Sequence, residues 1–317
     1  MTTRTKQKSP AAAAKATAGN NGFSLISNQK LLQLYTAMVR CRMIEERARA
    51  VFKQSKSTGN YGAAVGQEAA AVGVAIDLGP DDAISPAHRD FIVDFIKGVP
   101  LDSTFCRLFA RAASPAPSGY APLNVIPPSS NLAARLDIAA GVALANKMQN
   151  NGKIAVAFSG DGSASLESWR EALHFAGVHQ LPILFVCQNN VPVEPLHRKT
   201  QARGEEIALH AQACGIPAMP VDGNDVVAVY RVATEAIAQA RKGNGPTLIE
   251  CKTCGRQGHS ATGPGNAHDP ILNMEKYLTR KGLFSIELKL EVAAAFSREL
   301  DAAIAAAGKS PLAEGKD

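Results

Sequence analysis

The sequence has 317 residues, of which 46% are hydrophobic and 20% are charged, and its formal net charge is +6. This length and composition are typical of a globular chain, and no apolar run approaches the roughly 20 residues that a membrane-spanning helix needs. Four basic and no acidic residues lie in the first 20 positions, which leaves +2 for the rest of the chain. That small charge, with few aromatic residues, argues against nucleic acid as a partner.

Both ends of the chain have the composition of disordered tails. Residues 1–22 are rich in Ala, Lys and Thr and contain no apolar stretch of a secretory signal. Their lack of acidic residues leaves a mitochondrial transit peptide open as an alternative. Residues 307–317 form the second predicted tail. No repeat and no change of composition interrupts the intervening stretch, so we predict one domain over residues 23–306.

The six cysteines are scattered, and we interpret them as reduced thiols of the core or of loops. Cys251 and Cys254 form the one C-x-x-C motif, and no second pair follows at the spacing of a zinc site. Reduced thiols imply a reducing compartment, so we expect a cytoplasmic protein.

Apolar periodicity and turn residues predict an alternation of helices and strands. In chain order we predict helices over 29–54 and 67–77, a strand over 83–85, helices over 90–97 and 102–112, a proline-rich loop over 114–129, a helix over 132–148, and strands over 153–158, 182–187 and, after two further helices, 247–253. Strands that alternate with helices of this length predict an α/β fold, a parallel sheet with helices on both faces.

Polar residues follow two of these predicted strands. Gly160-Asp161-Gly162 comes after the first of them, and Asn189-Asn190 comes after the second, which places Asn190 29 positions after Asp161. If the strands are neighbours in one parallel sheet, both side chains lie at its carboxyl edge, where open α/β sheets bind ligands. One carboxylate and one amide oxygen suit Mg²⁺, which takes few protein ligands and completes its shell with phosphate and water. The glycines allow a diphosphate to approach the backbone, and the following helix is expected to offer its N-terminal amides.

Competing chemistries lack their motifs. We find no G-x-G-x-x-G after a strand, no phosphate-binding G-x-x-x-x-G-K-[ST] and no G-x-S-x-G in the sequence. A dinucleotide-binding, nucleotide-hydrolysing or serine hydrolase function is therefore not indicated.

The GDG…NN segment resembles the motif of thiamine diphosphate enzymes. Its surroundings resemble the α subunit of the E1 component of 2-oxoacid dehydrogenases, the family of the pyruvate, branched-chain 2-oxoacid and acetoin enzymes. The resemblance extends from about Leu31 to about Leu283 and includes LYTAMVRCRMIEERA, GAAVGQEAAAVG, HRDFIVDFIKG and GPTLIECKT. It implies a thiamine diphosphate-binding fold, with thiamine diphosphate and Mg²⁺ as cofactors.

The resemblance also implies a role for individual residues. The metal would be held by Asp161, Asn190 and the carbonyl oxygen of Pro192. The cofactor would be bound by His88, Arg89, Ser130, Leu132, Gly160, Asp161, Gly162, Ser163, Asn190 and His259. In the family Arg holds the diphosphate, Ser bonds the aminopyrimidine, and the apolar residue at the Leu132 position wedges between the thiamine rings. His259 would be the catalytic histidine of a loop after the last strand.

The implied activity is an oxidoreductase reaction shared with other chains. An E1 enzyme decarboxylates a 2-oxoacid, or cleaves acetoin, and passes the acyl group to a lipoyl-bearing E2 protein. A β subunit supplies the glutamate that activates the cofactor, so we expect an α₂β₂ heterotetramer. The Ala-rich helices over 67–77 and 132–148 are suited to close packing against that β chain.

The substrate side of the family pattern is altered. His88 stands where the family has Tyr, the Met-His before the Ser-x-Leu segment is missing, and Cys254-Gly255 replaces Tyr-Arg. Two hypotheses follow from these differences. The chain is either an active E1 α subunit with an unusual substrate or a non-catalytic paralogue that binds the cofactor or a β-like partner and regulates or scaffolds.

Overall fold

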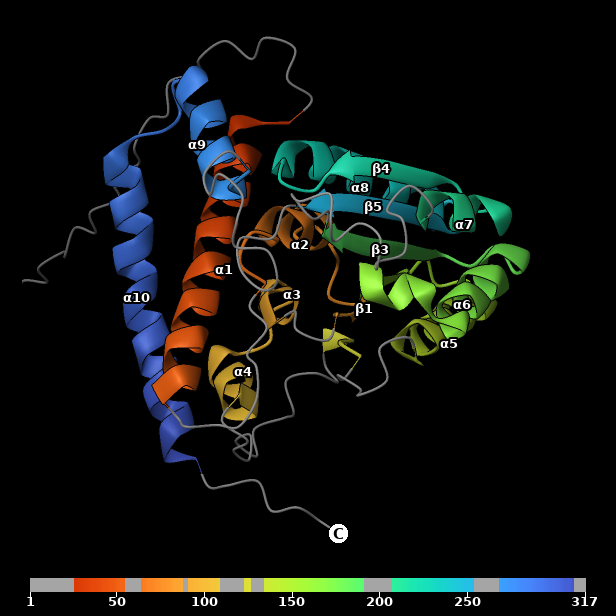
Figure 1. Cartoon of the computed structure of the whole chain (residues 1–317), viewed down its shortest axis with the longest axis horizontal. Coiled ribbons are helices and arrows are strands. Elements are labelled where there is room, and N and C mark those ends of the chain that lie inside the picture. The colour runs from red at the N-terminus through yellow and green to blue at the C-terminus, as the bar shows by residue number, and fades with distance from the viewer. Residues whose placement is uncertain are drawn as a thin grey trace, which may run out of the picture.

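The structure, a computed structural model, describes residues 26–54, 64–87, 91–108, 123–126, 134–190, 207–253 and 268–310. Within these residues the chain forms a five-stranded sheet in the order β1-β2-β3-β5-β4, in which every neighbouring pair is parallel (Figure 1). The predicted α/β fold with a parallel sheet is therefore confirmed. None of the helices in these ranges is long and apolar enough to cross a membrane.

The strands are β1 (Ala83–Ser85), β2 (Ala155–Gly160), β3 (Ile183–Asn190), β4 (Ala218–Asp222) and β5 (Thr247–Thr253). The amino-terminal helices are α1 (Asn28–Gln54), α2 (Glu68–Ala75), α3 (Phe91–Ile96), α4 (Leu101–Leu108) and α5 (Ala134–Gln149). The later helices are α6 (Glu167–Val178), α7 (Ile207–Ala213), α8 (Val226–Arg241), α9 (Pro270–Arg280) and α10 (Ile286–Lys309). The last helix thus continues past residue 306, after which the sequence predicted a tail.

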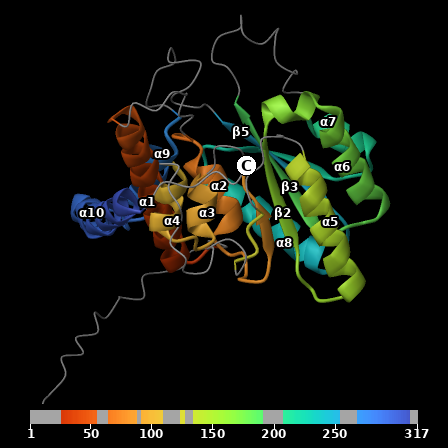
Figure 2. The same ribbon diagram turned by 90° about the horizontal axis from the view of Figure 1, so that it is seen from below.

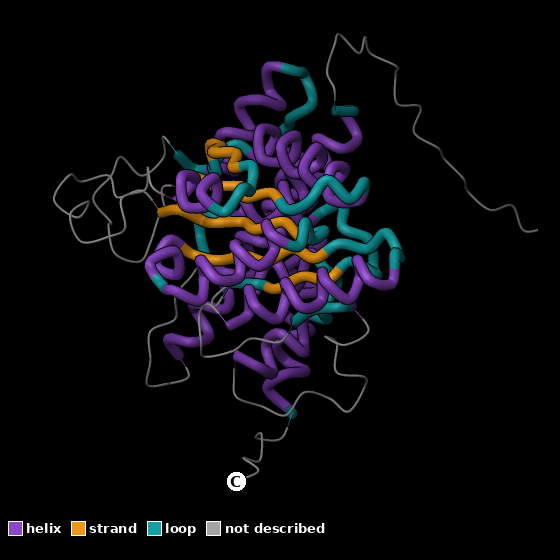
Figure 3. Tube along the Cα trace, turned by 90° about the vertical axis from the view of Figure 1, so that its right-hand side faces the viewer, coloured by secondary structure: helices purple, strands orange, loops and turns teal. Residues whose placement is uncertain are grey.

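Helices cover both faces of the sheet. Because successive side chains of a strand point to opposite faces, the buried strands contribute side chains to two separate cores. Val156 and Phe158 of β2 pack with α2 and α8, whereas Ala155 and Ala157 pack with α5, α6 and α7. Figure 2 shows α5, α6 and α7 gathered on one side of the sheet, and Figure 3 shows the strands as a layer between helices.

A further layer of helices lies outside α2. The long helices α1 and α10 run side by side there, with α9 next to them (Figure 1). A third apolar cluster joins α1, α4 and α10, with Ile44, Phe105 and Phe296 almost completely buried in it. The sheet is therefore supported by helices packed on both of its faces, and the outer helices add a third apolar cluster.

Helix α2 belongs to the core of this chain. All eight of its residues are buried, and a Cβ atom added to Gly73 would lie 2.7 Å from Cγ1 of Val229 in α8. The glycine therefore permits close approach of two helices within one chain. The expectation that this Ala-rich helix docks on a β chain is wrong, because its small side chains are already used. The expectation remains open for α5.

Strand β4 was missed by the sequence analysis. It contains Pro220, lies at the edge of the sheet and has mostly half-buried side chains, so it lacks the continuous apolar run of the central strands. Proline is tolerated in edge strands because no ladder hydrogen bond is needed on the open side. Length and pattern were therefore too weak to predict it.

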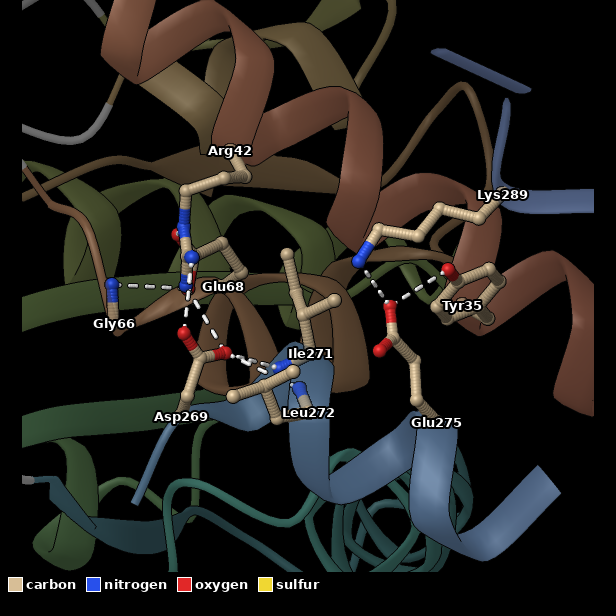
Figure 4. A network of polar contacts seen from close by, with 9 residues as sticks. All are labelled: Tyr35, Arg42, Gly66, Glu68, Asp269, Ile271, Leu272, Glu275 and Lys289. Atoms are coloured by element: carbon tan, nitrogen blue, oxygen red, sulfur yellow. Dashed lines mark hydrogen bonds and ion pairs between the residues drawn. The ribbon is translucent and has the colours of Figure 1, made fainter. Parts of the chain in front are cut away.

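A buried ion-pair network fixes α1, the start of α2 and the start of α9. The guanidinium group of Arg42 donates to Glu68 at 2.5 and 3.1 Å and to Asp269 at 3.1 and 3.5 Å (Figure 4). Both carboxylates are almost fully buried. Asp269 also caps α9 by accepting from the backbone N–H groups of Ile271 and Leu272 at 2.9 and 3.2 Å.

Two opposing effects act on the pKa of Asp269. Burial alone would raise this pKa, but the hydrogen bonds and charge of Arg42, with the two amides of α9, bring it below its ordinary value. Nearby, Glu275 of α9 accepts from the Tyr35 hydroxyl at 3.0 Å and pairs with Lys289 at 2.9 Å, which ties α9 to α1 and α10 (Figure 4).

We predict that Arg42→Met lowers the free energy of unfolding by about 3–5 kcal/mol at pH 7, because it leaves two buried carboxylates without a cation. The stability that Arg42 gives through Asp269 is present above the pKa of an unfolded Asp and is lost as the pH falls through the lowered folded pKa. In the variant the buried carboxylate takes up a proton more readily. The difference between variant and wild type should therefore shrink as the pH is lowered toward about 4. Urea unfolding at several pH values measures both effects.

Arg47→Met is the matched control. Arg47 lies on the same helix and pairs with Asp301, but the two side chains are 41% and 57% exposed. Such a pair is worth less than about 1 kcal/mol, so this variant should unfold almost like the wild type at every pH. Equal losses for the two variants would contradict the assigned role of Arg42.

Candidate active site

Three neighbouring strands end at one edge of the sheet. Strands β2 and β3 pair in parallel with Gly160 opposite Gln188, and β3 pairs with β5 with Asn190 opposite Thr253. The two motif-bearing strands are parallel neighbours, so the condition on which the sequence argument rested is met. Asp161 follows β2 directly, and Asn190 is the last residue of β3.

The side chains of Asp161 and Asn190 interact. The Asn190 amide donates a hydrogen bond to the Asp161 carboxylate, which also accepts from the backbone N–H groups of Asp161 and Gly162. Burial is the largest influence on Asp161 and raises the pKa of its carboxyl above the ordinary value, while these three hydrogen bonds lower it in part. Within the described residues, this half-buried carboxylate forms no ion pair with a cationic side chain.

The oxygen of the Asn190 amide is held by two donors. It accepts from Nε2 of Gln67 at 2.7 Å and from the hydroxyl of Thr253 at 2.8 Å. Gln67 immediately precedes α2, and Thr253 is the fully buried last residue of β5. One amide thus joins β2, β3, β5 and the start of α2.

A second polar contact lies on the opposite face of β3. Nδ2 of Asn189 donates to Glu250 at 2.8 Å, and both residues are buried. On the same side, Nε1 of Trp169 in α6 reaches Oγ of Ser159 at 3.4 Å. Burial in this apolar region raises the pKa of the Cys187 thiol, which keeps it protonated and unreactive. These buried contacts support the carboxyl edge from the face of the sheet opposite Asn190.

The backbone of the GDG segment is open to a ligand. A Cβ atom added to Gly160 or to Gly162 would have no described atom within 4 Å. Residues Asp161–Ser165 form a 3-10 turn, and α6 begins only at Glu167. A helix thus follows the motif as expected, but only after this 3-10 turn, and the contact of its N-terminal amides with a diphosphate stays a prediction. The 3-10 turn and the strand end supply the backbone there.

Several predicted site residues lie outside the described residues. These are His88, Arg89, Ser130, Leu132, Pro192 and His259. The structure brings together Asp161 and Asn190, with Gly160, Gly162 and the buried Ser163 on the adjoining strand end and turn.

The sequence analysis did not identify the residues that hold Asn190. Gln67 and Thr253 lie 123 and 63 positions from it, and neither belongs to the spacing that defined the motif. A weak signal was available for Thr253, because a polar residue ends a third predicted strand. Nothing in the local sequence distinguishes Gln67 from an ordinary residue before a helix.

Chemically, this edge has the properties of a binding place for a hard cation with an anionic ligand. The described residues contain no group of three or more His, Cys, Asp or Glu side chains that could hold a metal ion. A cation at Asp161 would therefore take one carboxylate, one amide oxygen and further oxygens from outside this set, the ligand pattern typical of Mg²⁺ bound to phosphates.

Comparison with known proteins identifies the family. Residues 36–315 match the dehydrogenase E1 component family. Over 295 residues the chain is 32% identical to the pyruvate dehydrogenase E1 component subunit alpha of Staphylococcus aureus strain Mu50, which covers 88% of this chain and 78% of the relative. The protein of the same name from Staphylococcus epidermidis strain RP62A is 31% identical with the same coverage. The chain belongs to the dehydrogenase E1 component family, as a divergent relative of its alpha subunits.

Proposed function

We propose that this chain is the α subunit of an E1 enzyme that acts on a 2-oxoacid, or on acetoin, with thiamine diphosphate and Mg²⁺. The acyl group would pass to a lipoyl-bearing E2 protein, as the resemblance to E1 enzymes implies. The observation that carries the proposal is the contact between Asp161 and Asn190 at the carboxyl edge, beside two glycines with open space around them. The similarity to pyruvate dehydrogenase alpha subunits supports the same conclusion.

The donor set at the edge fits a diphosphate-bound magnesium ion. Asp161 and Asn190 would bind the ion together with the carbonyl oxygen of Pro192. The diphosphate would lie along the backbone of Gly160, Gly162 and Ser163. The remaining proposed contacts to the cofactor come from His88, Arg89, Ser130, Leu132 and His259. When bound, thiamine diphosphate supplies the nucleophile that attacks the 2-oxo carbon.

A partner chain is part of the proposal. No described residue near the edge is a glutamate placed to activate the cofactor, and the resemblance assigns that group to a β subunit in an α₂β₂ assembly. Helix α5 offers a surface for such a partner. Ile138 and Met148 are 49% and 79% exposed on its outer side, and Gly141 lies between them. Small and apolar side chains at this spacing permit close packing of a second helix.

The second candidate function is a non-catalytic paralogue. It is favoured by the altered substrate side, where His88 and Cys254-Gly255 replace the family's residues. Such a protein would still bind the cofactor or a β-like chain but would not turn over a 2-oxoacid. Discovery of a β chain encoded beside this one, with its activating glutamate, would favour the active enzyme.

We predict that Asp161→Asn abolishes Mg²⁺-dependent binding of thiamine diphosphate. The amide keeps an oxygen acceptor for the backbone N–H groups and removes a desolvated charge, so the ligand-free variant should be at least as stable as the wild type. Ligand at 100 times its Kd should stabilise the wild type by about 2.7 kcal/mol and the variant by almost nothing. Thermal unfolding with and without ligand and EDTA measures this difference, and equal stabilisation of both proteins would sink the metal assignment.

We also predict a stable complex with a β chain. Co-expression should give a roughly equimolar assembly of α₂β₂ mass in light scattering. Ile138→Lys should weaken the assembly, because it places a charge on the outer face of α5. Ile286→Lys is the matched control, since Ile286 is 66% exposed at the start of α10, away from α5. A chain that remains monomeric with every candidate β chain would favour the non-catalytic paralogue.

His259 is proposed as the catalytic histidine. With the α–β complex and its 2-oxoacid, His259→Ala should lower kcat by roughly 10²–10⁴, the usual contribution of a proton-transferring side chain, and leave cofactor affinity within a few-fold. His268→Ala, at an exposed histidine just before α9, should change neither quantity. A parallel fall in affinity and kcat would show that His259 only anchors the cofactor.

A further inference from the structure

We propose that Gln67 and Thr253 are positioning residues that hold the Asn190 amide in either of two orientations. In one orientation the amide nitrogen donates to Asp161, and in the other the amide oxygen binds a cation together with Asp161. The inference rests on the proposed metal site and goes beyond it, because it assigns a role to two side chains that do not touch the ion. It starts from the hydrogen bonds that Asn190 makes in this structure.

In this structure two hydrogen-bond donors occupy the oxygen of the Asn190 amide. An amide oxygen has two lone pairs, and both are used here by Nε2 of Gln67 at 2.7 Å and the hydroxyl of Thr253 at 2.8 Å. The nitrogen, which has no free lone pair for a metal, is the atom that faces Asp161. Asn190 thus partly compensates the carboxylate charge by itself. A cation shared with Asp161 requires the oxygen on that side, so the amide has to rotate by half a turn.

Thr253 and Gln67 can each change from hydrogen-bond donor to hydrogen-bond acceptor toward Asn190. A hydroxyl both donates and accepts, and a primary amide presents an oxygen or a nitrogen after its own rotation. Once the Asn190 nitrogen points away from Asp161, it can donate its two hydrogens to the Thr253 oxygen and the Gln67 oxygen. The Thr253 hydrogen then needs another acceptor, and the backbone carbonyl of Asn189 already lies 3.4 Å from that hydroxyl. The Asn190 amide and the Thr253 hydroxyl therefore keep hydrogen-bond partners in both orientations.

Neither residue is free to drift away from Asn190. Thr253 is fully buried and lies opposite Asn190 in the β3–β5 ladder. Gln67 follows Gly66, whose φ of +96° is easily adopted only by glycine and turns the chain into α2. The Gly66 N–H donates to Glu68 at 3.0 Å, and Glu68 is held by Arg42. The network of Figure 4 therefore fixes the backbone that presents Gln67.

Substitutions at the two positions should change metal affinity more than folding. Thr253→Val keeps the shape but can neither donate nor accept, and Gln67→Met keeps the length without polar atoms. Loss of the groups that orient a metal ligand costs roughly 10–100-fold in metal affinity, and we expect that range for both variants. Thr253→Ser keeps the hydroxyl and should bind like the wild type. Thr247→Val, a buried threonine at the other end of β5, is the matched control and should also bind like the wild type.

The experiment measures the Kd for Mg²⁺ at saturating thiamine diphosphate by calorimetry, with the full chain in complex with its β chain. Melting temperatures without Mg²⁺ report any general loss of stability. A structural role alone would lower the melting temperature without the change in Kd, and this result would overturn the inference. The same substitutions in an Asn190→Ala background should have no further effect on Kd, because both residues act through that amide.

The outcomes separate the two proposals. A wild-type complex that binds thiamine diphosphate without any need for Mg²⁺ overturns the proposed metal site and this inference with it. A wild-type complex with normal Mg²⁺ dependence, combined with unchanged Kd in Thr253→Val and Gln67→Met, overturns this inference alone. A weakened Kd that persists in the Asn190→Ala background also overturns it, because the effect would then bypass Asn190.

Discussion

Arg42 joins three parts of the chain that are far apart in sequence, and the geometry of the sheet edge depends on that junction. Its guanidinium group lies between Glu68 at the start of α2 and Asp269 at the start of α9, with both carboxylates almost fully buried. Neither acid would tolerate this burial without the cation. The ion pairs therefore seat α2, and the residue before that helix is Gln67, which reaches the amide of Asn190. A contact on the outer layer of helices thus determines a position at the carboxyl edge.

The edge itself shows a division between support and function. Below it, the side chains of β2, β3 and β5 are apolar and fill two cores. Toward the carboxyl ends of β3 and β5 polar side chains bond to each other, Asn189 to Glu250 on one face of the sheet and Asn190 to Thr253 on the other. Buried polar groups that satisfy one another make a rigid platform. Asp161 differs, because burial raises its pKa and it gains no opposite charge within the described residues that surround it.

The parts of this structure that the sequence predicted are those set by local pattern. The central strands are buried on both faces and appear as continuous apolar runs, and their order along the chain placed Asp161 and Asn190 at one edge. The edge strand β4 escaped prediction because its exposed side chains and Pro220 blur that pattern. An Ala-rich helix fits a subunit interface as well as an interior, so only the packing of Gly73 against Val229 shows which of the two α2 serves. The contact of Gln67 with Asn190 joins residues 123 positions apart and follows from tertiary structure alone.

The energetics of the edge bear on the choice between an active enzyme and a non-catalytic relative. An amide side chain at position 161 could accept from the same backbone N–H groups without a half-buried charge. The carboxylate therefore makes the ligand-free fold less stable than it could be, and such a residue is typical of a site that a ligand completes. Binding of a cation would reverse the penalty and would free the Asn190 nitrogen for Thr253 and Gln67. A protein that only scaffolds a partner through α5 has no use for this arrangement, whereas a protein that binds a magnesium diphosphate requires it. The edge thus favours cofactor binding over pure scaffolding. The residues on the substrate side then decide whether the cofactor-binding chain is catalytic or regulatory.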